Sequence, residues 1–186
     1  MPIAKQTSPS GSQAGSQKKR RGGTASEYKK SLQEKQILKR WYGLSERQFK
    51  KYVKATLLRM GKVEDVANEL IRRIEKRLDN VVFRLGFALS RAHARQLVSH
   101  GIFLVNGKPV NIPSFELKKG DIITIKESKK SKPVFKDLAA LLKKKEIPLW
   151  LSLNKDKFEG KTIGEPSLKE VNPPAEISLI FEFYSR

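Results

Sequence analysis

Residues 90–110 read SRAHARQLVSHGIFLVNGKPV, and the change of pattern inside this stretch decides the fold. Before Gly101 the apolar residues recur at helical spacing, and Ser90 stands where a helix N-cap is expected. After Gly101 the apolar residues alternate, and Asn106-Gly107 lies between two apolar runs, which is the strongest short signal for a β-hairpin. The stretch therefore predicts a helix over 91–100 followed by a hairpin.

The predicted helix carries two arginines, Arg91 and Arg95, one turn apart on its exposed side. Two like charges at this spacing cost roughly 0.2 to 0.5 kcal/mol in an isolated helix. A phosphate between them would remove that cost, and Ser90 with the free N–H groups of the first turn would add an anion site. Two interpretations stay open here: a phosphate clamp made by Ser90, Arg91 and Arg95, or a surface helix that is merely basic.

The composition points to a polyanionic partner. The 186 residues include 39 Lys and Arg against 19 Asp and Glu, a formal net charge of +20, which favours nucleic acid. The absence of cysteine excludes disulfides, thiolate zinc sites and cysteine nucleophiles. The longest apolar run, 138–142, is far too short to span a bilayer, and no secretory signal is visible. We therefore expect a soluble, cytoplasmic protein.

Residues 1–26 form the first of four expected segments, a disordered basic tail. They are rich in Ser, Gly and Gln and contain no acidic or aromatic residue, so they cannot bury enough apolar surface to fold alone. The run Lys18, Lys19, Arg20 and Arg21 fits a nucleic-acid arm, a localisation signal or a solvated tail.

Residues 27–76 are expected to form a helical unit. The pattern divides at Gly43, and Ser45 is a plausible cap for the helix that follows it. That helix has an apolar face and an opposite face of four cations, which are Arg47, Lys50, Lys51 and Lys54. Most of these charges lack an acidic neighbour three or four residues on, which favours a phosphate-facing surface over a simply solvated one.

Residues 77–127 read as a second unit, and residues 128–186 as a segment that completes the fold, whose last strand could pack on the sheet or on the helical unit. An apolar helical stripe from Leu78 stops at Gly86, before the helix and hairpin described above. Residues 128–186 suggest a basic linker, a short helix around 138–142, and strands at 148–154 and 176–186. The last strand is predicted from alternation, with four residues on one side: Ile177, Leu179, Phe181 and Phe183.

The sequence offers no convincing active site or metal site. His93 and His100 share a helical side, but two histidines without further ligands or an HExxH spacing do not make a zinc centre. Asp79 stands in an Arg-Leu-Asp triplet similar to one in a class of pseudouridine synthases. The triplet lies in a helical stripe, where helix capping or an ion pair with a nearby arginine explains it better.

Four stretches closely resemble the family of bacterial small-subunit ribosomal proteins S-four, and in the same order. They are LQEKQILKRWYGLSERQFKKYV (32–53), RLDNVVFRLGFALSRAHARQLVSHG (77–101), VNGKPVNIPSFELKKGDIITIKE (105–127) and EISLIFEFYSR (176–186). The chain resembles a Cys-free variant of this family with a short N-terminal tail. The stretch 77–127 is similar to the S-four RNA-binding domain, which occurs in several RNA-binding proteins.

The resemblance implies an α+β fold, with a helical rRNA-binding unit and a domain whose helices pack on a small antiparallel sheet. It implies a structural constituent of the small subunit that binds 16S rRNA early, nucleates assembly of the subunit body and influences translational accuracy. Implied partners are 16S rRNA, neighbouring ribosomal proteins, especially S-five, and mRNA at the entry channel, near Lys18, Lys19, Arg20 and Arg21. No cofactor and no metal are implied.

The resemblance implies most of the following candidate RNA-binding residues, and the helical faces described above add Lys51 and Ser90 to them. In the helical unit they are Lys35, Gln36, Lys39, Arg40, Tyr42, Arg47, Gln48 and Lys51. In the second unit they are Ser90, Arg91, Arg95, Gln96, His100, Asn106 and Lys108. The alternative functions are an RNA-modifying enzyme or a ribosome-rescue factor carrying the same RNA-binding domain. A weaker third alternative is membrane-surface binding through the basic helix 45–60.

Overall fold

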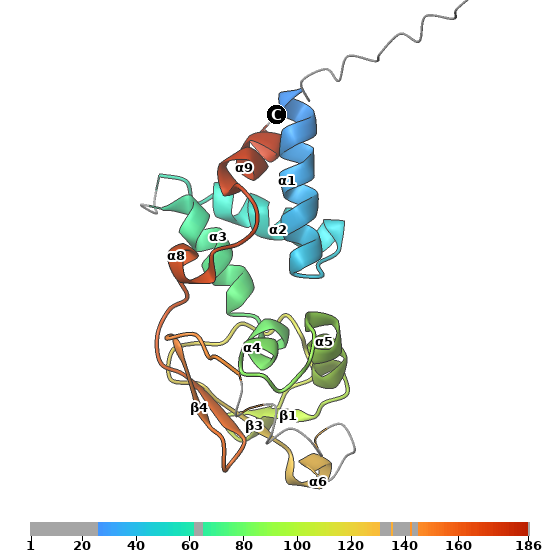
Figure 1. Cartoon of the computed structure of the whole chain (residues 1–186), viewed down its shortest axis with the longest axis vertical. Helices are drawn as coiled ribbons and strands as arrows, with labels where there is room; N and C mark the ends of the chain where they lie inside the picture. Colours follow the sequence, from blue (N-terminus) through green and yellow to red (C-terminus); the bar gives the residue numbers. More distant parts are fainter. Residues whose placement is uncertain (1–25, 62–64, 131–134, 136–141, 143–144, 186) are drawn as a thin grey trace, which may run out of the picture.

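The computed structural model describes residues 26–61, 65–130, 135, 142 and 145–185. Figure 1 shows a helical unit above a second unit in which α4 and α5 lie on a small sheet. The α+β fold expected from the sequence is confirmed. The helix expected around 138–142 lies outside the described residues except for Leu142, which is buried.

The helical unit is built from α1 (Glu27–Trp41), α2 (Glu46–Leu57) and α3 (Val66–Glu75), with two late helices packed on them, α8 (Leu168–Val171) and α9 (Ile177–Ser185). Ser45 caps α2 as predicted, and its side chain and that of Gln48 form a reciprocal capping box. Asp65 caps α3. Gly43, in the turn between α1 and α2, has a φ of 61°, a left-handed conformation that glycine adopts without strain.

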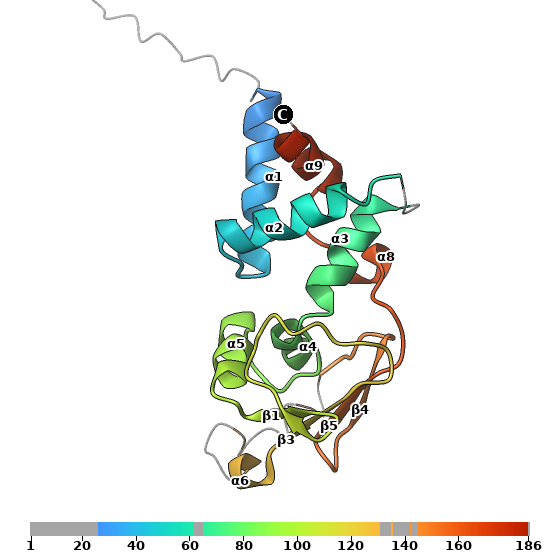
Figure 2. The ribbon, with the colours of Figure 1, turned by 180° about the vertical axis from the view of Figure 1, so that it is seen from behind.

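The strand predicted over 176–186 is wrong, because this segment is helix α9. Residues 177, 180, 181 and 184 recur at helical spacing, and all four pack in the cluster of apolar residues formed by α1, α2 and α3. Phe183 lies against Tyr28 of α1, and Tyr184 lies against Phe49 of α2. Figure 2 shows α9 lying alongside α1, so the C-terminal segment completes the helical unit and not the sheet.

The second unit contains α4 (Leu78–Arg84), α5 (Arg91–Ser99) and a sheet of five strands. A short helix, α6 (Glu127–Lys130), comes between β3 and β4 in the chain. The strands are β1 (Phe103–Val105), β2 (Lys108–Pro109), β3 (Ile122–Ile125), β4 (Leu151–Asn154) and β5 (Glu159–Thr162). Their order is β2-β1-β3-β5-β4, with every pairing antiparallel. Strands β1 and β2 form the hairpin expected at Asn106-Gly107, where both residues have positive φ.

The C-terminal end of α4 packs closely on strand β5 of the sheet. A Cβ built at Gly160 of β5 would collide with the side-chain carbons of Leu85, so only glycine fits there. The core of this unit includes Leu78, Leu97, Phe103 and Ile123, all at most 4% exposed. The two units have separate apolar clusters that share no buried residue among those described.

Candidate nucleic-acid interface

The two units meet at a seam of polar bonds between the α1–α2 turn and the helices α4 and α5. Arg95 of α5 donates from Nε to Asp79 Oδ2 at 2.9 Å. Its Nη2 donates to the carbonyl of Tyr42 at 3.3 Å, and its Nη1 donates to the carbonyl of Gly43. Arg77 binds the same Asp79 carboxylate through two bonds of 3.0 and 2.7 Å and also donates to Tyr52 Oη. Asp79, only 2% exposed, is thus held by two arginines.

A second carboxylate, Glu75, is fully buried on the other side of the seam. Arg84 binds it through two bonds of 2.6 and 3.0 Å, the Tyr42 hydroxyl donates to it at 2.8 Å, and the Asn80 amide donates to it as well. Burial, followed by the charge of Glu75, raises the pKa of Tyr42 well above its ordinary value, so this hydroxyl stays a donor. Asn80 in turn accepts from Arg91 Nε at 2.9 Å.

The guanidinium of Arg91 is held mainly by aromatic rings. Its central carbon lies 4.2 Å from the ring centre of Trp41, 4.6 Å from that of Phe83 and 5.1 Å from that of Tyr42. Its Nη2 is buried without a hydrogen-bond partner among the described residues. Burial lowers the pKa of Arg91, but an arginine stays charged in a folded protein.

The expectation that Arg91 and Arg95 lie on the exposed side of α5 is wrong. Both side chains are half-buried, and both join α5 to other helices of the chain. Their partners belong to α4 and to the α1–α2 turn, so the periodicity of α5 itself does not reveal them. Ser90 is exposed and caps α5 through His93 N at 3.1 Å, as predicted. The ion pair proposed as the explanation for Asp79 is present, with Arg77.

Two further candidates, Lys35 and Tyr42, are also buried. Lys35 is 6% exposed, binds Glu46 at 3.0 Å and places its Nζ 4.4 Å from the ring centre of Phe183. Tyr42 is 2% exposed, with its hydroxyl on Glu75. Lys39 is half-buried and binds the other carboxylate oxygen of Glu46 at 3.0 Å. These side chains hold the helical unit together in the structure.

Glu46 gathers three donors at the junction of α1, α2 and α9. Partial burial acts to raise its pKa, but hydrogen bonds from Lys35, Lys39 and Tyr184 outweigh that effect and lower the pKa from 4.5 to about 2. A carboxyl whose pKa is lower in the folded state stabilises the fold above its ordinary pKa. That contribution disappears as the pH falls through the folded-state pKa.

We therefore expect Glu46→Gln to lower the free energy of unfolding at pH 6 and to have little effect at pH 2. The reason is that the stability contributed by the ionised carboxyl falls as the pH drops from 4.5, its ordinary pKa, to about 2, its pKa in the folded protein. Urea titrations of both proteins at pH 6, 4 and 2 measure the difference. A difference that stays constant down to pH 2 would contradict the assignment.

The remaining candidates are accessible to a partner. The exposed candidate residues are Arg40, Arg47, Gln48, Lys51, Ser90, Gln96, His100, Asn106 and Lys108, and Gln36 is half-buried. Two of them also have structural bonds: Gln48 completes the α2 capping box, and Asn106 binds Asp121 and Ile122 N across the hairpin. Lys18, Lys19, Arg20 and Arg21 lie outside the described residues.

The exposed cations form a recognisable surface on the helical unit. Arg40 at the end of α1 and four residues of α2 (Arg47, Lys50, Lys51 and Lys54) are exposed, and none of them has an ion-pair partner among the described residues. We call these five residues the α2 cationic face. Lys108 at the hairpin is likewise exposed, and it forms no ion pair with any residue that the structure describes. Sequence reasoning placed Lys50 and Lys54 on this face.

Sequence reasoning did not identify Glu75, Asn80 and Arg84 as members of the seam. The signal available for them was a set of polar side chains inside the apolar pattern of 70–85, where a buried polar group needs partners. The positions alone do not name those partners. The sequence likewise does not identify Trp41 and Phe83 as ring partners for Arg91, because they lie on other helices, α1 and α4.

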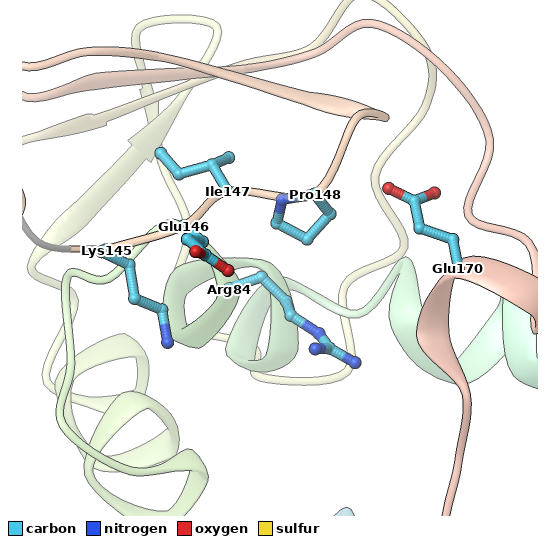
Figure 3. Close-up of a pocket in the computed structure, with 6 residues that line it drawn as sticks. All are labelled: Arg84, Lys145, Glu146, Ile147, Pro148 and Glu170. Atoms are coloured by element: carbon cyan, nitrogen blue, oxygen red, sulfur yellow. The ribbon is translucent and has the colours of Figure 1, made fainter.

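A small pocket of about 230 Å³ lies beside the seam, lined by Arg84, Lys145, Glu146, Ile147, Pro148 and Glu170. Figure 3 shows Arg84 projecting from α4 toward the side where Glu170 lies, with Lys145 on the opposite side. Two cations and two carboxylates balance one another, and Glu170 already accepts from Leu149 N at 2.5 Å. This balance of charge does not favour an anionic ligand.

The part of the chain that the structure describes contains no group of three His, Asp or Glu side chains placed to hold a metal ion. No helix in that part is long and apolar enough to cross a membrane.

Comparison with known proteins gives the family. Residues 4–75 match the model of the ribosomal protein S4/S9 N-terminal domain, and residues 76–123 match that of the S4 domain. The chain is 46% identical to small ribosomal subunit protein uS4 of Thermodesulfovibrio yellowstonii over 88% of this chain and 77% of the relative. The chain belongs to the uS4 family.

Two more relatives in the uS4 family cover similar shares of the chain. Small ribosomal subunit protein uS4A of Symbiobacterium thermophilum is 40% identical over 100% of this chain and 85% of its own length. Small ribosomal subunit protein uS4 of Sulfurihydrogenibium sp. is 47% identical over 86% of this chain and 78% of its own length. The boundary between the two family models, at residues 75 and 76, falls where α3 ends and the chain enters the second unit.

Proposed function

We propose that this uS4 family member binds the 16S rRNA of the small subunit directly, through the α2 cationic face together with the hairpin around Lys108. The observation that carries the proposal is that these cations are exposed and have no acidic partner in the part of the chain that the structure describes. Five like charges on one surface repel one another, and phosphates placed against them relieve that repulsion.

As a member of the uS4 family, the protein is a structural constituent of the small ribosomal subunit, located in the cytoplasm, and is not an enzyme. The burial of Asp79 between Arg77 and Arg95 agrees with this, because no RNA substrate can reach that carboxylate. The RNA-modifying enzyme considered from the sequence is therefore set aside.

The proposed contacts are the exposed candidates of both units. Those in the helical unit are Gln36, Arg40, Arg47, Gln48 and Lys51, and those in the second unit are Ser90, Gln96, His100, Asn106 and Lys108. Proteins cannot read base edges in the deep, narrow major groove of A-form RNA, so these residues would recognise mainly the shape of a folded junction. The hydrogen bonds of the seam join the two units that carry these residues, an arrangement that suits a junction of several helices.

The finer partners are also part of the proposal. Protein S-five as a neighbour, mRNA at the entry channel, early nucleation of subunit assembly and an influence on translational accuracy all follow from the family resemblance. The basic run at 18–21 is the segment proposed for mRNA.

Site-directed cleavage tests whether both units bind one RNA region. Because the chain has no cysteine, Lys54→Cys on α2 and Lys119→Cys beside the hairpin each give a single attachment point for an iron chelate that cuts nearby RNA. Both tethers are expected to cut the backbone of one folded region of 16S rRNA. Primer extension on the cleaved RNA maps the positions of the cuts.

The matched control is Lys155→Cys, in the turn between β4 and β5 at the other edge of the sheet from β2. It is exposed and is expected to leave the RNA uncut. Cuts from only one of the two test positions, or equal cuts from all three, would contradict the composite surface.

A further inference from the structure

We propose that Arg95 and Asp79 are positioning residues for RNA binding: the bonds from Asp79 through the Arg95 guanidinium to the Tyr42 and Gly43 carbonyls fix the angle between the two units. The proposal rests on the proposed function, since the angle matters only if one RNA contacts both units. In this proposal Arg95 orients the two units instead of binding a phosphate directly, as the sequence had suggested.

The first support is the absence of an apolar core between the units. Their two apolar clusters share no buried residue among those described, so no shared apolar core fixes their orientation. The rings of the two units meet through the Arg91 guanidinium, which contacts Trp41 and Tyr42 of one unit and Phe83 of the other. Apolar contact is non-directional in any case. Charge-assisted hydrogen bonds are short and directional, and they are therefore the contacts at this seam that specify an angle.

The second support is the bonding of Arg95 itself. All three of its guanidinium nitrogens are used: one on Asp79 of α4, and two on consecutive carbonyls of the α1–α2 turn. A guanidinium is a planar fork of fixed shape, so it ties Asp79 and that turn together in one geometry. One of these carbonyls belongs to Gly43, which adopts the left-handed conformation in this turn.

The third support is the charge of the seam. Four arginines (Arg77, Arg84, Arg91 and Arg95) surround only two carboxylates, Glu75 and Asp79, and Arg91 Nη2 has no hydrogen-bond partner among the described residues. Buried ion pairs often add little net stability because desolvation cancels the attraction, and orientation is a role they can still fill. Three of the five N–H groups of the half-buried Arg95 are committed to bonds within the seam.

The test measures the angle without RNA. Nitroxides on Lys54→Cys and Lys119→Cys report the distance between the units by pulsed electron resonance, and the chain has no other cysteine to react. The protein that carries only these two labelled cysteines, which we call the background protein, is expected to give one narrow distance distribution. Arg95→Met, similar in length but without donors, and Asp79→Asn are both expected to broaden it, whereas Lys155→Met, which removes one charge from an exposed turn, leaves it unchanged.

The affinity for 16S rRNA then separates positioning from charge. If only about a tenth of Arg95→Met molecules hold the competent angle, the apparent affinity falls about tenfold. Asp79→Asn raises the net charge by one, so simple electrostatics predicts tighter binding, while loss of the angle predicts weaker binding. The slope of log K against log salt is expected to stay unchanged in both variants.

Three results would overturn the proposal. One is an unchanged distance distribution in both variants. Another is a salt slope in Arg95→Met reduced by about 0.7 to 0.9, the value of one lost phosphate contact. The third is tighter binding by Asp79→Asn.

Circular dichroism and the melting temperature identify any variant that fails to fold, and Arg95→Lys then replaces Arg95→Met. Failure of the wild-type protein to bind 16S rRNA would instead contradict the proposed function, whatever the distances show.

Discussion

Replacing Glu75 by alanine is expected to lower the free energy of unfolding by about 3 to 5 kcal/mol, the cost of removing one partner of a buried ion pair. Glu75 is fully buried at the end of α3 and accepts hydrogen bonds from Arg84, Tyr42 and Asn80. Its removal leaves the Arg84 charge without a counterion and two neutral donors without their acceptor. The large cost comes from these orphaned groups more than from the lost attraction.

Urea denaturation followed by circular dichroism measures the change. Glu165→Ala is the matched control, because Glu165 also pairs with a basic side chain, Lys76 at 2.6 Å, but its side chain is 44% exposed. Exposed pairs contribute about 0 to 1 kcal/mol. Equal losses in the two variants would show that the burial of Glu75 has no energetic consequence.

The elements that local sequence rules govern were predictable. Ser45 and Ser90 cap their helices, and Asn106-Gly107 forms the hairpin turn, because each signal depends on neighbouring residues only. The segment 176–186 was not predictable in this way. Alternation at Ile177, Leu179, Phe181 and Phe183 and a helical stripe through Ile177, Ile180, Phe181 and Tyr184 coexist in the same letters. Packing against α1 and α2 selects the helix.

The candidate site divides along the same line. The α2 cationic face could be predicted, because an amphipathic helix places its charges opposite a core that the sequence also reveals. The roles of Arg91 and Arg95 could not, because their partners, Asp79, Asn80 and the α1–α2 turn, come from other helices. The sequence pattern of a basic residue at helical spacing does not distinguish a side chain that binds a phosphate from one that binds a buried carboxylate.

The largest effect expected of this protein is the salt dependence of its binding to 16S rRNA. Six exposed cations without ion-pair partners among the described residues are available for phosphates, namely Arg40, Arg47, Lys50, Lys51, Lys54 and Lys108. With about 0.7 to 0.9 per phosphate, six contacts give a slope of log K against log salt of about −4 to −5. Affinity then falls roughly a thousandfold between 50 and 200 mM salt.

The double variant Arg47→Ala and Lys51→Ala is the natural comparison. Both side chains are exposed on α2, so the melting temperature is expected to change little, while two lost contacts reduce the slope by about 1.4 to 1.8. Lys155→Ala, also an exposed cation, is expected to leave the slope as it is.

The measurement that tests the central claim most directly is this salt titration of 16S rRNA binding by the wild-type protein, carried out by filter binding from 50 to 200 mM KCl. The account predicts tight binding at low salt that weakens with a slope of about −4 to −5. Binding whose affinity does not change with salt over this range would contradict it, because the exposed cations would then have no phosphates as partners.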